Sequence, residues 1–522
     1  MPSAFFTTNM AAIVGWIIES VREILQISGL SLQSFLVFCT AFSLACFLLK
    51  PRRNLPPYPA GRVPVLGHLL ALGRAPHLKL TAWRWQYGDV FTVRMGMEDV
   101  VVLNGYTAVK DALVDRSELF ASRPTNYLLD ALPGSGKDIA SASWGTEFRQ
   151  RKRFATAVLK NLGMKVGTGS IEVKIQEEAS CLRNRVAEYN GNPTDITHDV
   201  TVAVANVVCS MVMGKRYDYQ DETFRELSEA VVRSAIEAGA GQILSVFPFL
   251  RFVPVVNRAG MNALNEVLKI TNVLREEISH HRENLDRENP RDFLDFCLLE
   301  VEKQEKVEGL TEENVLYMAQ NLFLAGTETT TNTLMWSLLY MTLNPDTQKK
   351  VQQELDVVVG ESLPTLSHRS QLHYVNACLL EVMRIRPIVP LSVPHATTKT
   401  VKVEEYQIPK ETQILLNLHS LHMDPAYWPD PDRFDPGRFL DSEGNVINKP
   451  ESFMPFGGGK AKMPTRVCLG EQLARMELFL FFSTLLQSFS FKSLDGAPTP
   501  NTDGVFGLTL KSHPFKLCAI PR

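Results

Sequence analysis

The chain has 522 residues, of which 45% are hydrophobic and 21% charged, and its formal net charge is −3. This composition, without a low-complexity tract or an internal repeat, indicates a globular protein with a large core. The slight negative charge argues against a nucleic-acid-binding protein, which normally has a basic surplus. The eight cysteines form no CxxC pair, which argues against a disulfide-stapled secreted domain or a structural zinc site.

The first element in chain order is an uncharged run of 20 residues, Leu30–Leu49. It is long enough to cross a bilayer as a helix, the alternative being a buried core helix. Basic residues Lys50, Arg52 and Arg53 follow at once, so the positive-inside rule places the rest of the chain on the cytoplasmic side. The apolar stretch Met10–Ile27 carries three charges; it can lie in the membrane interface, and its entry into the bilayer stays open.

A proline-rich segment, Leu55–Pro59, follows the apolar run. Proline stiffens such a tether and prevents the membrane helix from continuing. No comparable linker occurs further along the chain. We therefore expect a membrane-anchor region at residues 1–53, with a transmembrane helix at about 30–49, and one large domain at residues 54–522.

Two later stretches have distinctive patterns. Ile243–Val256 is apolar without helical or strand periodicity, and it is either an exposed patch that contacts a bilayer or a buried loop. Thr311 to about Leu343 predicts one long helix that ends at Asn344-Pro345. Its middle, Ala325–Thr331 (AGTETTT), is rich in poor helix formers whose hydroxyls can bond carbonyls four residues back. Such a helix can bend and open a pocket for a small ligand, or it can be a core helix with a tolerated kink.

The next elements in chain order are a short charged helix and a hairpin. Glu381 and Arg384 are three positions apart, so their side chains can pair on one helix face. The Asp430–Phe434 segment (DPDRF) lies between this pair and the densest motif of the chain. Val401–Leu418 predicts a hairpin whose apolar strands flank Pro409–Glu411.

That motif runs from Phe453 through a glycine-rich stretch to Arg466-Val467-Cys468. It ends where a helix is predicted at Gln472–Phe489. A helix start and backbone N–H groups are expected to lower the pKa of the Cys468 thiol. A thiolate is the strongly donating ligand that a ferric haem needs for O–O cleavage, and glycines allow close approach to a porphyrin. The alternative is a buried structural cysteine.

The cysteine loop resembles the ligand motif of the cytochrome P-450 superfamily, Phe-x-x-Gly-x-Arg-x-Cys-x-Gly. The match requires that five residues, Ala461 to Thr465, be treated as an insertion. The insertion either bulges away from the iron or comes from an alternative splice site or gene-model error. The matching residues are Phe456, Gly459, Arg466, Cys468 and Gly470.

The resemblance extends to the other motifs. It implies that Glu328 and Thr329 of the long helix relay protons to dioxygen, and that Glu381, Arg384 and Arg433 form a buried structural network. It also implies haem b as the cofactor, with Cys468 as the axial ligand of its iron. Where the family usually has a Trp, this chain has Phe148, which lacks an indole N–H donor. Residues implied to contact the haem or its propionates are Arg123, Lys152, His395, Phe456 and Arg466.

The likeness covers about Asn54 to Arg522 and is strongest to the U subfamily of the animal microsomal family-2 group, with the J subfamily next. His281–Pro290 and Leu339–Met341 carry the likeness to the U subfamily, whose members hydroxylate long-chain fatty acids near the ω end. The implied fold is mainly α with a small, mostly antiparallel β region. The implied substrate-facing residues are all apolar: Phe323, Ala325, Val389, Leu391, Val393 and Leu508.

The resemblance implies an NADPH-dependent monooxygenase of the endoplasmic reticulum membrane with its catalytic domain facing the cytoplasm. The implied partners are NADPH-cytochrome P-450 reductase, the lipid bilayer, a hydrophobic small-molecule substrate and, optionally, cytochrome b5; no nucleic acid is expected. Within this class the alternatives are a xenobiotic or steroid hydroxylase. From other classes they are a haem-thiolate isomerase or dehydratase, against which the intact Glu328-Thr329 pair argues, and an inactive haem-binding protein.

Overall fold

In the computed structural model, most of residues 55–522 are described, together with residues 31, 33–34, 37–38 and 40–42. The exceptions are residues 97, 126–129, 132–133, 165–169, 448, 459–464, 495 and 497. The predicted span Leu30–Leu49 lies largely outside the described residues, and Met10–Ile27 lies wholly outside them. Among the described residues, no helix combines the length and the apolar character needed to span a bilayer.

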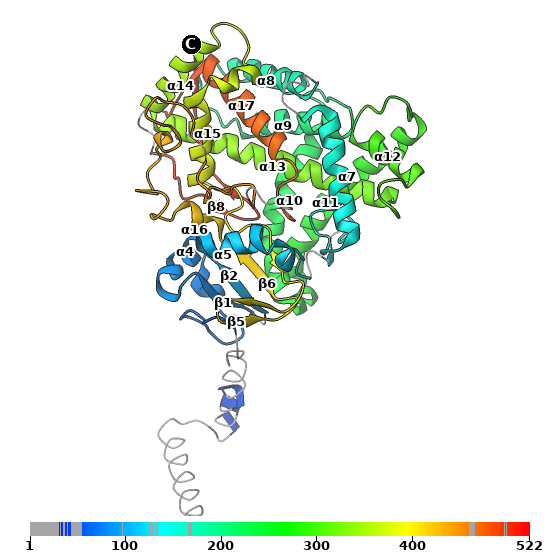
Figure 1. Cartoon of the computed structure of the whole chain (residues 1–522), viewed down its shortest axis with the longest axis vertical. Coiled ribbons are helices and arrows are strands. Elements are labelled where there is room, and N and C mark those ends of the chain that lie inside the picture. The colour runs from blue at the N-terminus through cyan, green and yellow to red at the C-terminus, as the bar shows by residue number, and fades with distance from the viewer. Residues whose placement is uncertain are drawn as a thin grey trace, which may run out of the picture.

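Helices form most of the described chain (Figure 1). The helices are α3 Leu69–Leu72, α4 Pro76–Tyr87, α5 Gly105–Lys110, α7 Thr146–Leu159, α8 Ser170–Glu188, α9 Thr197–Val212, α10 Glu222–Val246, α11 Pro254–Glu283, α12 Phe293–Lys303, α13 Glu312–Leu343, α14 Pro345–Val358, α15 His373–Ile385, α16 Leu418–His422 and α17 Glu471–Ser488. Shorter helical turns are η1 Asp111–Asp115, η2 Ser117–Phe120, η3 Lys160–Met164, η4 Pro248–Phe252, η5 Leu366–Ser370 and η6 Pro436–Phe439.

Within the described residues, the strands form one four-stranded sheet and three two-stranded sheets. The four-stranded sheet has the order β1 (Val90–Met95), β2 (Glu98–Leu103), β6 (Gln413–Leu416) and β3 (His395–Ala396). In it only β2 and β6 are parallel. The pairs are β4 (Val401–Val403) with β5 (Tyr406–Ile408), β7 (Phe489–Lys492) with β10 (Cys518–Pro521), and β8 (Val505–Phe506) with β9 (Leu510–Lys511), all antiparallel. The predicted mainly helical fold with a small, mostly antiparallel β region is confirmed.

The hairpin predicted around Pro409–Glu411 is wrong in its turn. The hairpin formed by β4 and β5 turns at Glu404-Glu405, where Glu404 has a φ of 52°. The apolar residues after Pro409 form β6, which pairs with β2 and β3 instead. Local alternation predicts that a strand forms but does not determine its partner, because pairing is decided by packing across the sheet.

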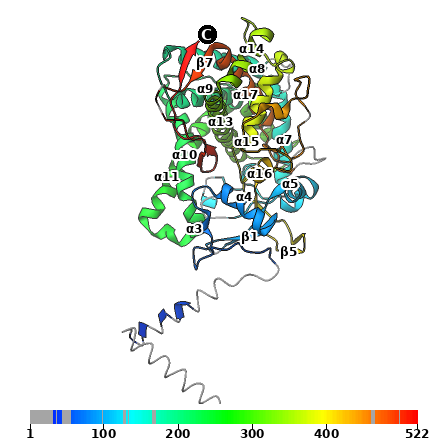
Figure 2. The same cartoon turned by 90° about the vertical axis from the view of Figure 1, so that its left-hand side faces the viewer.

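Helix α13 runs through the centre of the helical part, and it packs against α9 and α17 (Figures 1 and 2). It begins where the sequence predicts, because Thr311 and Asn314 cap each other's backbone N–H groups. It ends at Leu343, before Asn344-Pro345, as expected. Nearly all of its C-terminal half is buried, so this half of the helix lies in the hydrophobic core.

The buried ion pair predicted on α15 is present. Glu381 and Arg384 are both fully buried, with Arg384 Nε 2.7 Å from Glu381 Oε2. Arg433 is not the third member, since its side chain is exposed and only its carbonyl oxygen lies near Arg384. Arg438 takes that place, with Nε 3.4 Å from Glu381 Oε1. The chain turns again after Arg433 through η6, which brings the later arginine inward.

The junction between α10 and α11 contains the apolar stretch Ile243–Val256. It forms the end of α10, the turn η4 and the first residues of α11. Phe249 is 58% exposed and Phe252 is 75% exposed. Of the two alternatives left open by the sequence, this exposure favours an accessible apolar patch over a buried loop.

Candidate functional site

The cysteine loop is closed by a backbone hydrogen bond at the start of α17. The N–H of Cys468 donates to the carbonyl oxygen of Phe456 across 3.0 Å. Gly457 has a φ of 91°, a conformation that favours glycine. At Gly458 a Cβ would lie 2.7 Å from the backbone oxygen of Leu113, so a side chain does not fit there. Most of the predicted insertion, residues 461–464, lies outside the described residues.

Cys468 is an exposed residue, yet its thiol is desolvated by the protein around it. Burial raises its pKa, and the backbone N–H of Gly470 and the charges of Lys152 and Arg475 oppose this only in part. The expected lowering of the thiol pKa is therefore wrong for the protein alone, because desolvation outweighs the helix start. A bound metal ion removes the proton from a thiol outright.

Two cations contact this loop or belong to it. Lys152 of α7 donates from Nζ to the carbonyl oxygen of Thr465 at 2.9 Å and lies 3.3 Å from that of Val467. Burial lowers its pKa to about 8, and the nearby charge of Arg466 lowers it further. Arg466 donates to the carbonyl oxygens of Ala121 and Ile139. The structure thus brings the side chain of α7 and the cysteine loop together.

Arg123 completes this cation cluster. It donates to the carbonyl oxygens of Ala140 and Pro394 at 2.8 and 2.7 Å. Burial lowers the pKa values of both Arg123 and Arg466, and the carboxylate of Asp138 opposes this for each. Because a guanidinium does not lose its proton in proteins, both side chains stay charged in surroundings that disfavour a charge.

His395 and Phe148 lie against the same cluster. His395 Nδ1 lies 2.7 Å from the carbonyl oxygen of Phe120. Since a carbonyl only accepts, Nδ1 carries the hydrogen and Nε2 of the neutral ring is an acceptor. Burial and then the charge of Arg123 lower the pKa of His395 well below its usual value. Phe148 receives the guanidinium of Arg466 on its ring face at 3.9 Å, a cation–π contact in place of an indole N–H bond.

This donor set fits a haem. Three partly buried cations near one another match a planar ligand with two carboxylates, which needs cationic partners when buried. A protonated His395 would add a fourth donor, and a bound carboxylate would favour that protonation. Cys468, an exposed residue of the same loop as Arg466, would provide the axial sulfur. Phe456 carries the closing bond of the loop, and Arg475 lies 4.7 Å over its ring.

On α13, the structure separates the side chains of Glu328 and Thr329. Thr329 donates from Oγ1 to the carbonyl oxygen of Ala325 at 2.8 Å, the predicted bond to the residue four positions back. Glu328 Oε1 instead lies 2.8 Å from Lys511 Nζ and accepts from Thr509 Oγ1 at 3.0 Å. The two residues expected to relay protons are therefore not bonded to each other here.

The sequence analysis missed a buried carboxyl group next to this segment. Glu477 of α17 is 1% exposed and accepts from Thr330 Oγ1 at 3.2 Å, while its Oε1 has no partner. The hydroxyls of Thr327 and Thr331 are also buried and unpartnered. Burial raises the pKa of Glu477 to about 8. The sequence does contain a signal for this buried acid, because Glu477 is the single charged residue inside the apolar run Met476–Phe482.

The substrate-facing candidates divide into two groups. Ala325 is exposed although it lies in the middle of α13, and Val393 and Leu508 are 43% and 51% exposed. Accessible apolar residues beside a buried helix are expected where a hydrophobic ligand binds. Phe323 is wholly buried in the core, so it faces no open space in this structure. Leu391 is 9% exposed and Val389 is half-buried.

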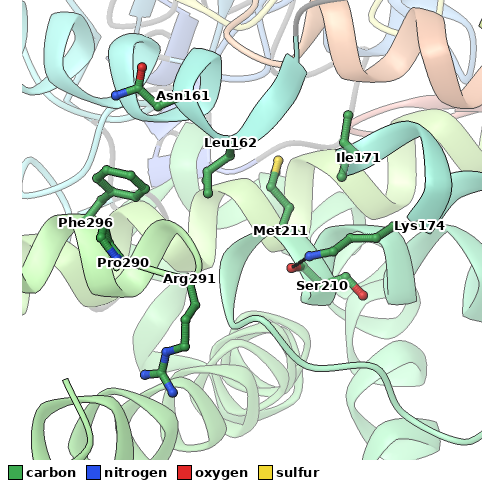
Figure 3. A pocket seen from close by; sticks show the side chains of 9 residues that line it. All are labelled: Asn161, Leu162, Ile171, Lys174, Ser210, Met211, Pro290, Arg291 and Phe296. Carbon is green, nitrogen blue, oxygen red and sulfur yellow. Dashed lines mark hydrogen bonds between the residues drawn. The ribbon is translucent and has the colours of Figure 1, made fainter. Parts of the chain in front are cut away.

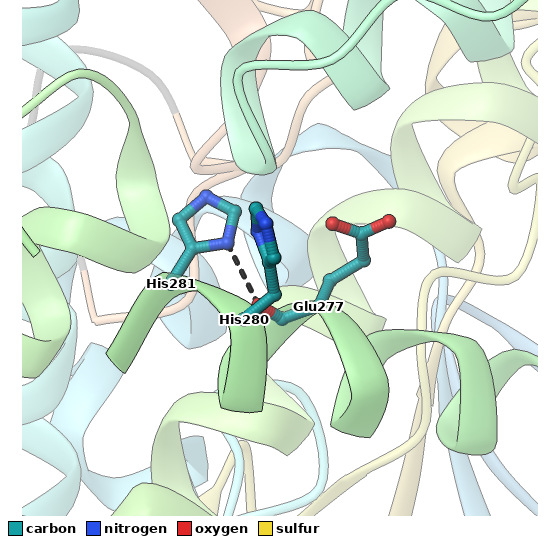
Figure 4. A group of neighbouring side chains, drawn as sticks. All are labelled: Glu277, His280 and His281. Carbon is teal, nitrogen blue, oxygen red and sulfur yellow. Dashed lines mark hydrogen bonds between the residues drawn. The ribbon is translucent and has the colours of Figure 1, made fainter. Parts of the chain in front are cut away.

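A cluster of three polar side chains lies outside this set of residues. Glu277, His280 and His281 of α11 approach one another (Figure 4). The two ring nitrogens of His281 lie 2.7 and 2.9 Å from the carbonyl oxygen of Glu277 and from Asp292 Oδ2, so this histidine joins α11 to α12 rather than holding a metal.

A cavity of about 200 Å³ lies between η3, α8, α9 and the start of α12 (Figure 3). Lys174 points into this region and donates to the carbonyl oxygen of Ser210 at 2.7 Å. Arg291 at its edge holds both carboxylate oxygens of Asp295. The residues that line this cavity include none of the cations around Cys468.

The helical fold, the exposed cysteine before α17 and the cation cluster fit a haem-thiolate protein. Comparison with known proteins agrees, since the family model "Cytochrome P450" matches residues 56–519. The chain belongs to the cytochrome P450 family.

Individual relatives refine this placement. Human cytochrome P450 2U1 is 40% identical over 438 residues, which cover 83% of this chain and 78% of that protein. Dog cytochrome P450 2D15 is 38% identical over 501 residues, covering 92% and 98%. Human cytochrome P450 2C8 is 38% identical over 497 residues, covering 93% and 99%. The predicted likeness to family 2 and its U subfamily is confirmed.

Proposed function

We propose that the chain is an NADPH-dependent haem-thiolate monooxygenase that inserts one oxygen atom of O2 into a hydrophobic substrate. The exposed Cys468 beside a cluster of partly buried cations is the observation that carries the proposal. Arg123, Lys152, His395 and Arg466 would hold the propionates. Haem, when bound through the Cys468 sulfur, supplies the activation of dioxygen.

The residues of α13 would deliver protons to the reaction, and apolar residues near them would exclude water. Thr329 holds a proton on Oγ1 in a bond to the Ala325 carbonyl oxygen, and Glu328 is a buried acid next to it in the chain. An acid and a hydroxyl in a mostly dry site can deliver protons one at a time. The apolar surfaces of Ala325, Val393 and Leu508 would keep water out while a substrate is bound.

For the substrate we propose long-chain fatty acids hydroxylated in the ω region. The U-like segments and the apolar character of the accessible residues support this choice. A xenobiotic or steroid hydroxylase is the alternative within the same reaction class. The intact Glu328-Thr329 pair disfavours an isomerase or dehydratase, which needs no proton delivery to dioxygen.

We further propose that the protein lies at the endoplasmic reticulum membrane. The anchor region at residues 1–53 would hold it there, and the exposed Phe249 and Phe252 would dip into the bilayer from the cytoplasmic side. The expected electron donor is NADPH-cytochrome P-450 reductase, with cytochrome b5 as an optional second partner. An alkaline-carbonate extraction of membranes, with and without residues 1–53, tests the anchor.

The function is tested with the full chain, the reductase and NADPH. A panel of long-chain fatty acids is compared with a panel of small aromatic drugs, and products are identified by mass spectrometry. Hydroxylated fatty acids that require NADPH support the proposal. Oxidised drugs without oxidised fatty acids overturn the substrate class, and turnover of a hydroperoxide without NADPH, with no monooxygenation, overturns the reaction class.

A further inference from the structure

The C-terminal hairpin, β8 and β9, is bonded to one stripe of α13. Three side chains at every fourth position, Glu328, Asn332 and Trp336, point to it. Asn332 donates from Nδ2 to Thr509 Oγ1 at 3.2 Å, and Trp336 donates from Nε1 to the carbonyl oxygen of Leu510 at 2.9 Å. Residues four apart lie on the same helix face, so this stripe docks the hairpin along the helix.

Glu328 is the stripe residue nearest to the proposed reaction site, and its partners are both on the hairpin. Its side chain is 10% exposed, and that of Lys511 is 24% exposed. Thr509, which donates to the same carboxylate oxygen, is 3% exposed. A charge-assisted bond in such surroundings directs a side chain more strongly than one at the open surface.

Glu328 and its chain neighbour Thr329 point in different directions and bond to different partners. Successive helix side chains diverge by about 100°, and Thr329 bonds to the Ala325 carbonyl oxygen rather than to the acid. The orientation of Glu328 is therefore set by the hairpin, which also carries the accessible Leu508. The hairpin proposed to contact substrate is thus bonded directly to the acid proposed to serve oxygen chemistry.

We propose that Lys511 is the positioning residue for Glu328. Its ammonium group fixes the rotamer of this acid, and through the hairpin it ties proton delivery to the occupancy of the space beside Leu508. This inference rests on the proposed monooxygenase function and deepens it. Lys511 itself touches neither substrate nor cofactor in this assignment.

The test compares three variants of the full-length, haem-loaded protein: Lys511→Met, Lys511→Arg and Lys516→Met. Lys516 lies on the same C-terminal segment and is exposed, so it is the matched control for loss of one positive charge. We expect Lys511→Met to lower the fraction of NADPH electrons recovered in product about fivefold, as ~1 kcal/mol for a partly exposed ion pair implies. The solvent deuterium isotope effect should change with it. Lys511→Arg should restore both, and Lys516→Met should alter neither.

A second readout does not depend on turnover. The infrared carboxyl bands of Glu328, obtained by subtracting the spectrum of Glu328→Gln, should shift in Lys511→Met and stay in place in Lys516→Met. An unchanged Glu328 band overturns the inference even if the wild-type protein oxidises nothing. A shifted band with unchanged coupling and isotope effect also overturns it, since the ion pair would then be structural only. If the wild-type protein shows no monooxygenation at all, the proposed function is overturned instead.

Discussion

The backbone N–H of Cys468 donates to the carbonyl oxygen of Phe456 at 3.0 Å. This bond closes the loop that carries the proposed haem ligand, although the chain between the two residues is five residues longer than in the family motif. The closure places the thiol at the start of α17 whatever path the extra residues take.

The first prediction concerns the ligand itself. Cys468 is the described cysteine that is exposed while desolvated by its surroundings. We expect Cys468→Ser to abolish the thiolate-type CO spectrum of the reduced protein. Cys378→Ser, at a wholly buried thiol, is the control and should retain this spectrum. A thiolate-type spectrum in Cys468→Ser would refute the assignment.

The second prediction concerns Ala461 to Thr465. Deleting these residues shortens the loop closed by the Phe456–Cys468 bond, which reduces the ordering cost by on the order of 0.5 kcal/mol. We expect the shorter protein to lose haem to apomyoglobin more slowly. Replacing the five residues with glycine and serine at constant length is the control. Equal rates of haem loss would show that the insertion is a tolerated bulge. Transcript sequencing separately tests its origin, and only reads that encode GKRVCLG would establish an artefact.

The third prediction concerns proton delivery. Thr329→Ala removes the hydroxyl that bonds to the Ala325 carbonyl oxygen but no haem contact. We expect normal haem content and diversion of NADPH electrons to hydrogen peroxide, because a positioned proton donor typically contributes on the order of a hundredfold or more to the step that it serves. Thr333→Ala, which removes an equivalent bond to the Thr329 carbonyl oxygen, is the matched control. Equal peroxide yields in the two variants would contradict the relay.

The fourth prediction separates the two candidate arginines. Arg438→Met removes a cation 3.4 Å from the buried Glu381, so we expect a loss of about 2 kcal/mol in the free energy of unfolding. Arg433→Met changes an exposed side chain and leaves the carbonyl contact to Arg384 in place. Urea unfolding of both variants measures the difference. Greater destabilisation by Arg433→Met would restore the original assignment.

The fifth prediction is a pH dependence. Burial raises the pKa of Glu477 to about 8 from its usual 4.5. Between these values the folded protein binds a proton that the unfolded chain has released, so stability falls as pH rises. In Glu477→Gln this decline should be smaller by more than ~1 kcal/mol, since each pKa unit corresponds to about that amount. Parallel urea midpoints from pH 5 to 8 in the two proteins would show that Glu477 does not titrate this way.

The sequence alone determined the features that depend on residues close together in the chain. The capped start of α13, its end before Asn344-Pro345 and the back-bonded Thr329 follow from propensities within a few residues. Cys468 was recognisable because its ligand motif is contiguous apart from one insertion. The pairing of Glu381 with Arg384 followed from helical spacing.

Tertiary structure decided everything that depends on distant partners. Arg438 rather than Arg433 reaches Glu381 because Arg438 lies in the helical turn η6, which packs against α15. Desolvation from several elements, absent from any local pattern, raises the pKa of Cys468. The bond between Glu328 and Lys511 joins α13 to the C-terminal hairpin, and a sequence window does not contain both. Local patterns fix which groups are present on a face, whereas packing fixes which groups meet and how much water remains between them.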